Sequence, residues 1–241
     1  LQIALIYRVI EYNPASDLKG AIKPYRKQHH PAITEPQAFG RLLNDIDSLP
    51  NSQLYQKEVL QLLALTFARI GDVCAMKWAD INLLTKQWEF RPQKAGRRDD
   101  MTDLVIPLAP QVVAILERMQ TLTGGHEYVF YNARRKEQKH ADPQRARELL
   151  NSPAMNEGKG YLGIHAPHGF RASAKTLLME RLGYDELITE LQLGHTMLNR
   201  YGRAYSRMEM INQRTEMMTA WADYLDNLKA GKFDNVIYLD S

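Results

Sequence analysis

Apolar residues recur at helical spacing along most of the chain. In the last long segment, Ile211, Met218, Trp221, Leu225 and Leu228 follow one another at intervals of seven, three, four and three residues. These intervals place the five side chains on one face of a helix, which we expect over about residues 207–229. Further helices are expected at 1–12, 35–48 and 52–67, from about 71, and at 110–122, 142–151, 170–182 and 185–192.

Two short segments alternate between apolar and polar residues instead. They are 87–92 (QWEFRP) and 103–108 (DLVIPL), and the polar segment QKAGRRDDMT separates them. This alternation predicts a β-hairpin. The helix at 35–48 has an entry signal in Thr34 as N-cap, Pro36 in the first turn and Gln37 at the third position. The pattern therefore predicts a mainly α domain with one small antiparallel β-sheet, an α+β fold.

The distribution of proline, lysine and histidine suggests where this domain begins. Residues 13–31 are rich in these residues and are expected to form a linker. We expect residues 1–30 to be the remnant of a preceding helical domain with its linker, 31–230 to be the main domain and 231–241 to be a C-terminal tail. The first residue is Leu rather than Met, which predicts a truncated or processed product of a longer protein.

Composition excludes several classes of protein. Of the 241 residues, 44% are hydrophobic and 24% are charged, which is typical of a soluble globular protein. No apolar run approaches the roughly 20 residues that span a bilayer, and the N-terminus does not resemble a signal peptide. The single cysteine, Cys74, excludes an internal disulfide and a multi-cysteine zinc site, and we expect it to be buried and inert. A reducing cytoplasm is the expected compartment.

The net charge of +3 does not by itself indicate a nucleic-acid partner, but the charges are unevenly distributed. Residues 131–150 carry six basic and three acidic groups, whereas the last 34 residues carry three basic and six acidic groups. Residues 91–98 and 191–207 contain basic residues and no acidic ones. The distribution fits either one basic face with an acidic tail or ordinary solvated surfaces, and charge alone leaves both open.

Motifs for several common chemistries are absent from the sequence. There is no glycine-rich phosphate loop, no HExxH and no GxSxG. His165 and His168 are three residues apart, but Pro167 lies between them and no acidic residue is close. We therefore expect no metal site, and we expect His165 to be a packing residue.

Several Arg, His, Lys and Tyr residues stand in distinctive local contexts. Each has a structural explanation when taken alone: Arg69 could cap a helix or pair with Asp72, His168 could begin a helix, and His195 could be a loop histidine. In chain order, the first group is Arg69 and Asp72, followed by Met76, Trp78, Asp80 and Ile81, and Lys94 comes next in the hairpin turn. His168 and Arg171 stand at the start of a helix, Leu193 and His195 follow a helix, and Ala204 precedes Tyr205, which is ten residues after His195.

In this order and at this spacing, the set resembles the tyrosine recombinase (phage integrase) family, and most of all the integrases of prophages and genomic islands. The residues from Arg69 to Ile81 match the family's first arginine box. His168 and Arg171 match its H-x-x-R box, His195 its L-x-H box, and Tyr205 its nucleophile. The resemblance covers about residues 30–230. It implies the tyrosine recombinase catalytic-domain fold, preceded in residues 1–30 by the end of a core-binding helical domain.

The resemblance also implies a function: site-specific DNA recombination through a 3′-phosphotyrosyl intermediate, for integration or excision of a mobile element. Arg69 and Arg171 would clamp the phosphate, because guanidinium forks match phosphate oxygens and stabilise their charge. His168 and His195 would donate to the same phosphate, and His168 would also help move the tyrosine proton. Tyr205 would be the nucleophile, Lys94 would protonate the departing 5′-oxygen, Asp72 would support Arg69, and Arg97, Arg98, Arg200 and Arg203 would bind DNA.

The expected partners follow from the same resemblance. They are double-stranded DNA attachment sites, three further copies of the protein in a tetramer on DNA, and accessory DNA-bending proteins. The isolated chain is expected to be a monomer, without cofactor, metal or ATP, and to act in the bacterial cytoplasm at the nucleoid.

Three alternatives remain open from the sequence. Tyr201 competes with Tyr205 by position, whereas Tyr224 fits a packing role on the last helix. The chain could also be a non-enzymatic DNA-binding or accessory module that keeps the fold. A type IB topoisomerase-like enzyme, which relaxes DNA without exchanging strands, is the third.

Overall fold

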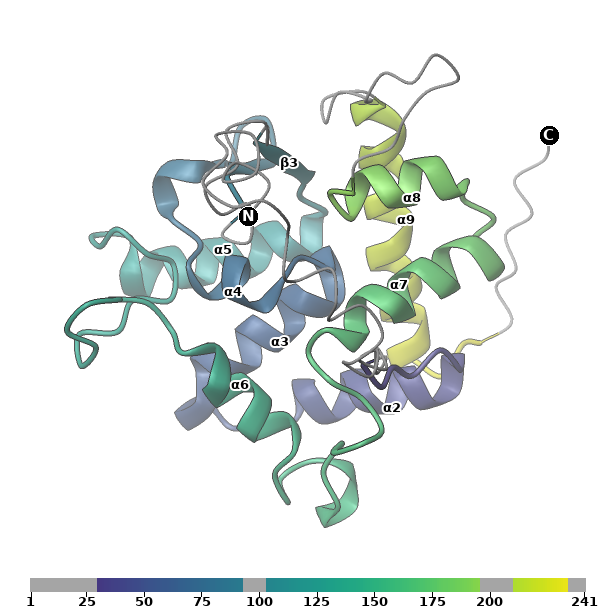
Figure 1. Cartoon of the computed structure of the whole chain (residues 1–241), viewed down its shortest axis with the longest axis horizontal. Coiled ribbons are helices and arrows are strands. Elements are labelled where there is room, and N and C mark those ends of the chain that lie inside the picture. The colour runs from purple at the N-terminus through teal and green to yellow at the C-terminus, as the bar shows by residue number, and fades with distance from the viewer. Residues whose placement is uncertain (1–29, 93–102, 196–209, 234–241) are drawn as a thin grey trace, which may run out of the picture.

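The computed structural model describes residues 30–92, 103–195 and 210–233 (Figure 1). It confirms a mainly helical fold with a small antiparallel sheet. Short 3-10 turns lie at Asn51–Gln53, Trp78–Asp80 and Asn156–Gly158. The α-helices within these ranges are α2 (Pro36–Asp47), α3 (Leu54–Thr66), α4 (Ile70–Cys74), α5 (Pro110–Thr123), α6 (Pro143–Leu150), α7 (Gly169–Glu180), α8 (Glu186–Gln192) and α9 (Ile211–Lys229).

The sheet is built on the predicted hairpin. Strands β2 (Gln87–Phe90) and β3 (Leu104–Pro107) pair antiparallel, with Trp88 opposite Ile106. A two-residue strand that the sequence pattern did not reveal, β1 (Ile81–Asn82), pairs with the other edge of β2. Two residues are too few to show an alternating pattern, so this strand could be found only from its pairing.

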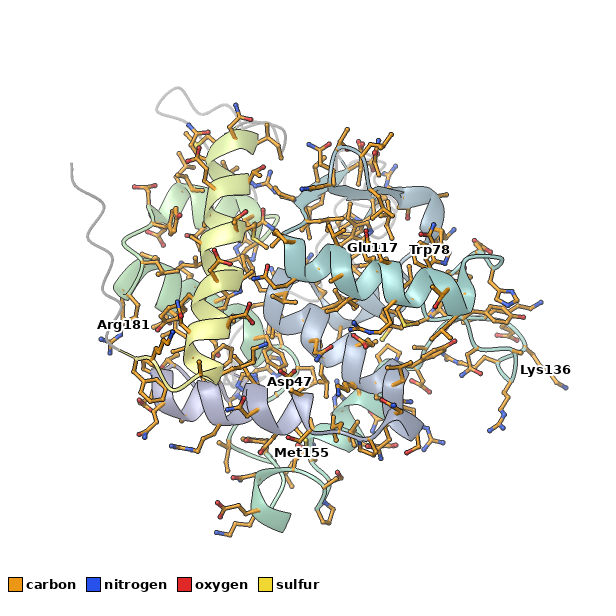
Figure 2. All side chains as sticks on the ribbon, turned by 180° about the vertical axis from the view of Figure 1, so that it is seen from behind. Asp47, Trp78, Glu117, Lys136, Met155 and Arg181 are labelled. Atoms are coloured by element: carbon orange, nitrogen blue, oxygen red, sulfur yellow. The ribbon has the colours of Figure 1, made fainter. Side chains whose placement is uncertain are left out.

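The core is organised around α3 and α9, whose apolar faces meet in the middle of the domain. Met218, Trp221, Leu225 and Leu228 are buried and Ile211 is half-buried, so four of the five residues predicted for this face lie in the core. The indole Nε1 of Trp221 donates to the carbonyl of Ala64 at 2.9 Å and so joins the two helices. Seen from behind, α5 passes in front of α3, and α9 stands beside them (Figure 2).

The first and last described helices of the domain are in direct contact. Helix α2 crosses the C-terminal end of α9, as both views show (Figures 1 and 2). At the crossing, a Cβ atom on Gly40 would lie 2.6 Å from the carbonyl oxygen of Leu228, so only glycine permits this approach. The side chain of Asn44 also donates to the carbonyl of Lys229, at 3.1 Å.

A completely buried arginine anchors the beginning of α9. Arg214 donates from Nε to the side-chain oxygen of Gln192 at 2.9 Å and from Nη2 to the carbonyl of Val105. These contacts join α9 to the end of α8 and to β3. A buried guanidinium is stable only when polar groups replace its water, which these two acceptors do.

Three boundaries differ from the sequence pattern. The expected N-cap Thr34 is wrong, because the Glu35 carboxylate accepts the N–H groups of Gln37 and Ala38, at 2.9 and 2.6 Å. Pro36 occupies the first helical position, so the residue directly before it becomes the cap. Helix α3 begins at Leu54 because residues 51–53 form a 3-10 turn, and α9 begins at Ile211 rather than 207. The predicted ends of the domain, at 31 and 230, stay predictions.

His165 is confirmed as a packing residue. It is almost fully buried, its ring lies 4.5 Å from that of Phe170 and 6.0 Å from that of Phe39, and its Nδ1 accepts the N–H of Ile33 at 3.1 Å. Burial disfavours the charged form and lowers the pKa of His165 to about 3. The ring is therefore neutral in the folded protein.

We expect this histidine to make the protein less stable as the pH falls below 6.5. In the unfolded chain His165 takes up a proton near pH 6.5, whereas in the folded chain it stays neutral down to about pH 3. Between these values the unfolded state therefore holds one more proton than the folded state. Each unit by which the pH is lowered in this range reduces the free energy of unfolding by about 1.4 kcal/mol.

Urea denaturation from pH 4 to 7 measures this effect. In His165→Asn, the amide oxygen can accept the Ile33 N–H and carries no titratable proton, so the unfolding free energy should fall less steeply with acidification than in the wild type. Parallel pH dependences in the two proteins would contradict the assignment.

Candidate active site

Arg171 is the central side chain of the candidate site. It stands in the first turn of α7 and is only 6% exposed. Its Nη1 donates to the carbonyl of Phe67 at 2.8 Å, and its Nη2 donates to the carbonyl of Leu193 at 2.7 Å. These carbonyls belong to the residues that follow α3 and α8, so one guanidinium holds three segments together.

Two residues with left-handed backbone turn the chain shortly before Arg69 and directly before His195. Phe67, with φ of 40°, ends α3 and redirects the chain to Arg69, the N-cap of α4. Gly194, with φ of 70°, ends α8 and precedes His195. A Cβ on Gly194 would lie 3.1 Å from Leu104, so glycine is favoured there both by its conformation and by space.

The electrostatics of the site are dominated by two arginines. Burial, together with the positive charge of Arg69, lowers the pKa of Arg171 to about 10, while Asp72 and Glu190 act in the opposite direction. Arg171 still carries its charge at neutral pH. Two neighbouring guanidinium groups whose charges repel each other form a site that an anion would stabilise.

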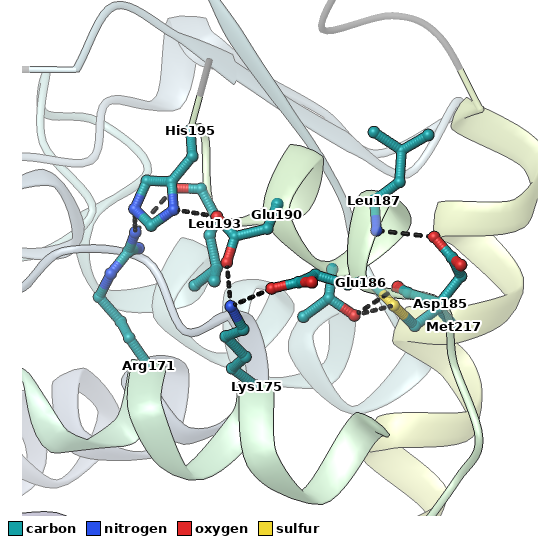
Figure 3. A network of polar contacts seen from close by, with 10 residues as sticks. Arg171, Lys175, Asp185, Glu186, Leu187, Glu190, Leu193, His195 and Met217 are labelled. Carbon is teal, nitrogen blue, oxygen red and sulfur yellow. Dashed lines mark hydrogen bonds and ion pairs between the residues drawn. The ribbon is translucent and has the colours of Figure 1, made fainter. Parts of the chain in front are cut away.

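His195 takes part in a network of polar contacts, shown in Figure 3. Its Nε2 lies 3.5 Å from Nη2 of Arg171, and its Nδ1 is in close contact with the Glu190 carboxylate. Glu190 in turn accepts from Nζ of Lys175 at 2.6 Å, and Lys175 also contacts Glu186 at 2.7 Å. Although burial opposes the shift, hydrogen bonds from Lys175 and His195 hold the pKa of Glu190 below its ordinary value.

His168 and Asp72 lie at the starts of the two helices that carry the arginines. His168 is the N-cap of α7; it is exposed, and its ring lies 4.8 Å from that of His30. Asp72 is buried in the first turn of α4, three residues after Arg69. The structure thus gathers Arg69, Asp72, Arg171 and His195, with His168 at the same end of α7.

The other predicted site residues lie outside the described residues, and their assignments stay predictions. This group contains the nucleophile and the acid expected from the sequence. Its members are Lys94, Arg97, Arg98, Arg200, Arg203 and Tyr205.

Sequence reasoning missed Glu190 and Lys175. A signal was available, because Lys175 stands one helical turn after Arg171, and Glu186 and Glu190 are also four residues apart. On two adjacent helices this spacing lines up a lysine opposite two carboxylates. Which lysine would face which carboxylate depends on how α7 and α8 pack.

The described residues offer neither a reactive thiol nor a metal centre. Cys74 is completely buried and burial raises its pKa to about 12, which confirms the expected buried, inert thiol. Within residues 30–92, 103–195 and 210–233, no group of three or more His, Cys, Asp or Glu is placed to hold a metal ion. Over the same ranges, every helix is too short or too polar to cross a bilayer.

Comparison with known proteins gives consistent results. The profile of the phage integrase family matches residues 34–210. Prophage integrase IntZ of Escherichia coli K12 is 30% identical over 234 residues, which cover 95% of this chain and 54% of IntZ.

Two solved structures are similar in fold. The integrase of mycobacterium phage Brujita superposes with a TM-score of 0.60 at 16% identity, over 97% of this chain and 73% of that chain. A lambda integrase tetramer bound to a Holliday junction superposes with a TM-score of 0.52 at 16% identity, over 90% of this chain and 56% of that chain.

The family profile spans well over half of the chain and contains Arg69, Arg171, His195 and the predicted nucleophile Tyr205. The chain covers about half the length of the curated relatives that it matches. It belongs to the phage integrase family.

Proposed function

We propose that the chain is the catalytic domain of a site-specific DNA recombinase that cuts and rejoins strands during integration or excision of a mobile element. The observation that carries the proposal is the buried Arg171, which contacts His195 and feels the charge of Arg69 nearby. The family membership and the names of the relatives, which include prophage integrases, support the same function.

Arg171 retains hydrogen-bond donors for a phosphate after making its backbone contacts. A guanidinium has five N–H groups, and the carbonyls of Phe67 and Leu193 use two of them. Those that remain, together with Arg69, can hold the nonbridging oxygens of a phosphodiester. The negative charge of the phosphate would offset the repulsion between the arginines, and the clamp would be stronger in a transition state that carries more charge on these oxygens.

The proposed reaction exchanges one phosphate ester for another. The phenol oxygen of Tyr205 attacks phosphorus and gives its proton to His168, while the bond from phosphorus to the 5′-oxygen breaks and Lys94 protonates that oxygen. The product is a 3′-phosphotyrosyl bond. The 5′-hydroxyl of another strand then attacks it and releases Tyr205. One phosphoester bond is broken and one is formed in each step, so neither step requires ATP.

A basic surface would hold the DNA beyond the cleaved phosphate. An open hollow of about 990 Å³ is lined by Arg134, Arg135 and Arg145 together with Tyr55 and Tyr131. This hollow shares no residue with the Arg171 cluster. Exposed guanidinium groups attract the DNA backbone without reading its sequence. Of the two readings that the charge distribution allows, this hollow favours a basic face that includes residues 131–150.

The lambda integrase tetramer on a Holliday junction suggests the assembly in which the reaction takes place. We propose that four copies act on two duplexes, with DNA-bending proteins as accessories, in the bacterial cytoplasm at the nucleoid. Without DNA we expect a monomer.

A nicked DNA substrate tests the proposed activity and identifies the nucleophile. The duplex carries the junction sequence of the genetic element that encodes the chain, with a nick a few nucleotides from the cleavage point, so that the short 5′-hydroxyl fragment is lost and the covalent complex accumulates. Trypsin cuts after Arg200, Arg203 and Arg207, which places Tyr201 in YGR and Tyr205 in AYSR. Mass spectrometry should find the nucleotide adduct on AYSR.

Each alternative function predicts a different result. An adduct on YGR would identify Tyr201 as the nucleophile. Relaxation of a supercoiled plasmid without recombinant products would indicate a topoisomerase-like enzyme. A wild-type chain that binds the duplex and forms no adduct would overturn the enzymatic proposal in favour of an accessory module.

A further inference from the structure

The end of α8 brings Glu190 and His195 together twice, through the backbone and through the side chains. The N–H of His195 donates to the carbonyl of Glu190 at 3.1 Å, and the N–H of Gly194 donates to that of Leu191 at 3.0 Å. This pair of bonds around a left-handed glycine is a Schellman motif. The motif folds His195 back over Glu190, where its Nδ1 meets the carboxylate.

Lys175 fixes the carboxylate from the neighbouring helix. Glu190 is only 12% exposed at its side chain, and its second oxygen accepts from Lys175 Nζ at 2.6 Å. Lys175 stands one turn after Arg171 on α7, so the contacts form a closed ring: Arg171 and Lys175 on one helix, and Glu190 and His195 at the end of the other (Figure 3). Neither the carboxylate nor the imidazole can rotate without breaking a contact in this ring.

The Glu190 carboxylate also determines which ring nitrogen of His195 carries a proton. An ionised carboxylate only accepts hydrogen bonds, so the His195 nitrogen that faces it, Nδ1, must be protonated. The other nitrogen, Nε2, then faces Arg171. A phosphate held by the arginines would meet Nε2, which becomes a donor when the ring takes up a second proton. The negative charge of Glu190 compensates the positive charge of that doubly protonated ring.

We propose that Glu190 is a positioning residue for the recombination reaction: it fixes the orientation and the Nδ1-protonated form of His195, so that Nε2 points to the phosphate between Arg69 and Arg171. The proposal rests on the proposed function for its effect on catalysis. The orientation of His195 itself does not depend on that function and can be measured without DNA.

Glu190→Gln is the informative variant, and Glu186→Gln is its matched control. A glutamine has one acceptor oxygen, whereas Lys175 and a protonated Nδ1 are both donors, so the amide cannot serve both. If the glutamine oxygen accepts from Lys175, the glutamine NH₂ group faces His195. An NH₂ group donates, so Nδ1 of His195 must then be the unprotonated nitrogen. Glu186 lies on the same helix and contacts the same lysine, but it does not contact His195.

Nuclear magnetic resonance of ¹⁵N-labelled histidine measures the protonated nitrogen in the 241-residue chain. The chain has seven histidines, and the spectrum of His195→Ala identifies the signal of His195. We expect the Nδ1-protonated form in the wild type and in Glu186→Gln, and a shift towards the Nε2-protonated form in Glu190→Gln. A His195 signal that is the same in all three proteins would overturn the proposal.

Cleavage of the nicked duplex measures the consequence for the reaction. Loss of a carboxylate that orients a metal-bound histidine lowers activity by about 10- to 100-fold. By analogy we expect Glu190→Gln to cleave about 10- to 100-fold more slowly, with unchanged DNA affinity. Glu186→Gln should stay within about twofold of the wild type. Glu190→Asp, whose shorter side chain withdraws the carboxylate from Nδ1, provides a second variant if Glu190→Gln folds poorly.

A double-mutant cycle shows whether Glu190 acts through His195. If it does, Glu190→Gln causes no further loss in a His195→Ala background. An equal loss in both backgrounds would assign Glu190 a general structural role and overturn the proposal. A wild-type chain without cleavage would contradict the proposed function, and the proton position on His195 would still decide the positioning role.

Discussion

Tyr205→Phe is expected to abolish the covalent protein–DNA complex while leaving DNA binding unchanged. The phenol oxygen is the atom that would bond to phosphorus, and phenylalanine keeps the ring but lacks that atom. Removing the nucleophile of a covalent enzyme lowers turnover by up to about 10⁶-fold, which in a gel assay of the nicked duplex means no detectable adduct.

Tyr201→Phe is the matched control, because Tyr201 lies four residues earlier in the same basic segment. It should form the adduct at the wild-type rate. Adduct formation by Tyr205→Phe, together with its loss in Tyr201→Phe, would transfer the nucleophile to Tyr201. The affinity of both variants for the duplex is measured at the same salt concentration. A variant that binds like the wild type but forms no adduct has lost the chemical step and not DNA binding.

Arg171→Lys is expected to lower the rate of cleavage by about 10²- to 10³-fold, the usual effect of removing one donor from a site that stabilises developing negative charge. The guanidinium reaches the carbonyls of Phe67 and Leu193 from two different nitrogens. A lysine has a single nitrogen and cannot span both carbonyls and a phosphate. Because lysine keeps the positive charge, a lower rate of cleavage would show the effect of the guanidinium geometry and not of the charge.

The same substitution should also destabilise the fold. A buried carbonyl left without its donor costs about 1–3 kcal/mol, which urea denaturation measures directly. Arg181→Lys is the control, since Arg181 is an exposed residue at the C-terminal end of the same helix. Cleavage by Arg171→Lys within about twofold of the Arg181→Lys rate, under conditions where both are folded, would contradict the proposed clamp.

The sequence predicted the helices within the described residues and the pairing of β2 with β3 because their patterns are local; the helix expected at 1–12 lies outside those residues. The apolar face of α9 follows from periodicity within one segment, and the pairing of β2 with β3 follows from alternation in two neighbouring segments. The two-residue strand β1 was missed because two residues are too few to show an alternating pattern, and the Glu35 cap was missed because it depends on competition between adjacent side chains.

The site was predictable as a set of residues but not as an arrangement. Arg69, Arg171 and His195 were chosen by resemblance to a family, and nothing in their spacing indicates that Arg171 would bond to the carbonyls of Phe67 and Leu193. Glu190 was missed for the same reason. Its role depends on the left-handed turn at Gly194 and on the way in which α7 packs against α8, and neither is visible in a linear pattern.

The contact between α2 and α9 has a consequence for the order in which the protein can acquire its structure during synthesis. Chains emerge from the ribosome N-terminus first, and a segment folds only when its packing partners have been made. Here the early helix α2 packs at Gly40 on Leu228, and Trp221 fills the core beside α3. The domain that contains α2 and α9 therefore cannot complete its core until α9 has been translated, and a product that ends before α9 would leave α2 and α3 without these contacts.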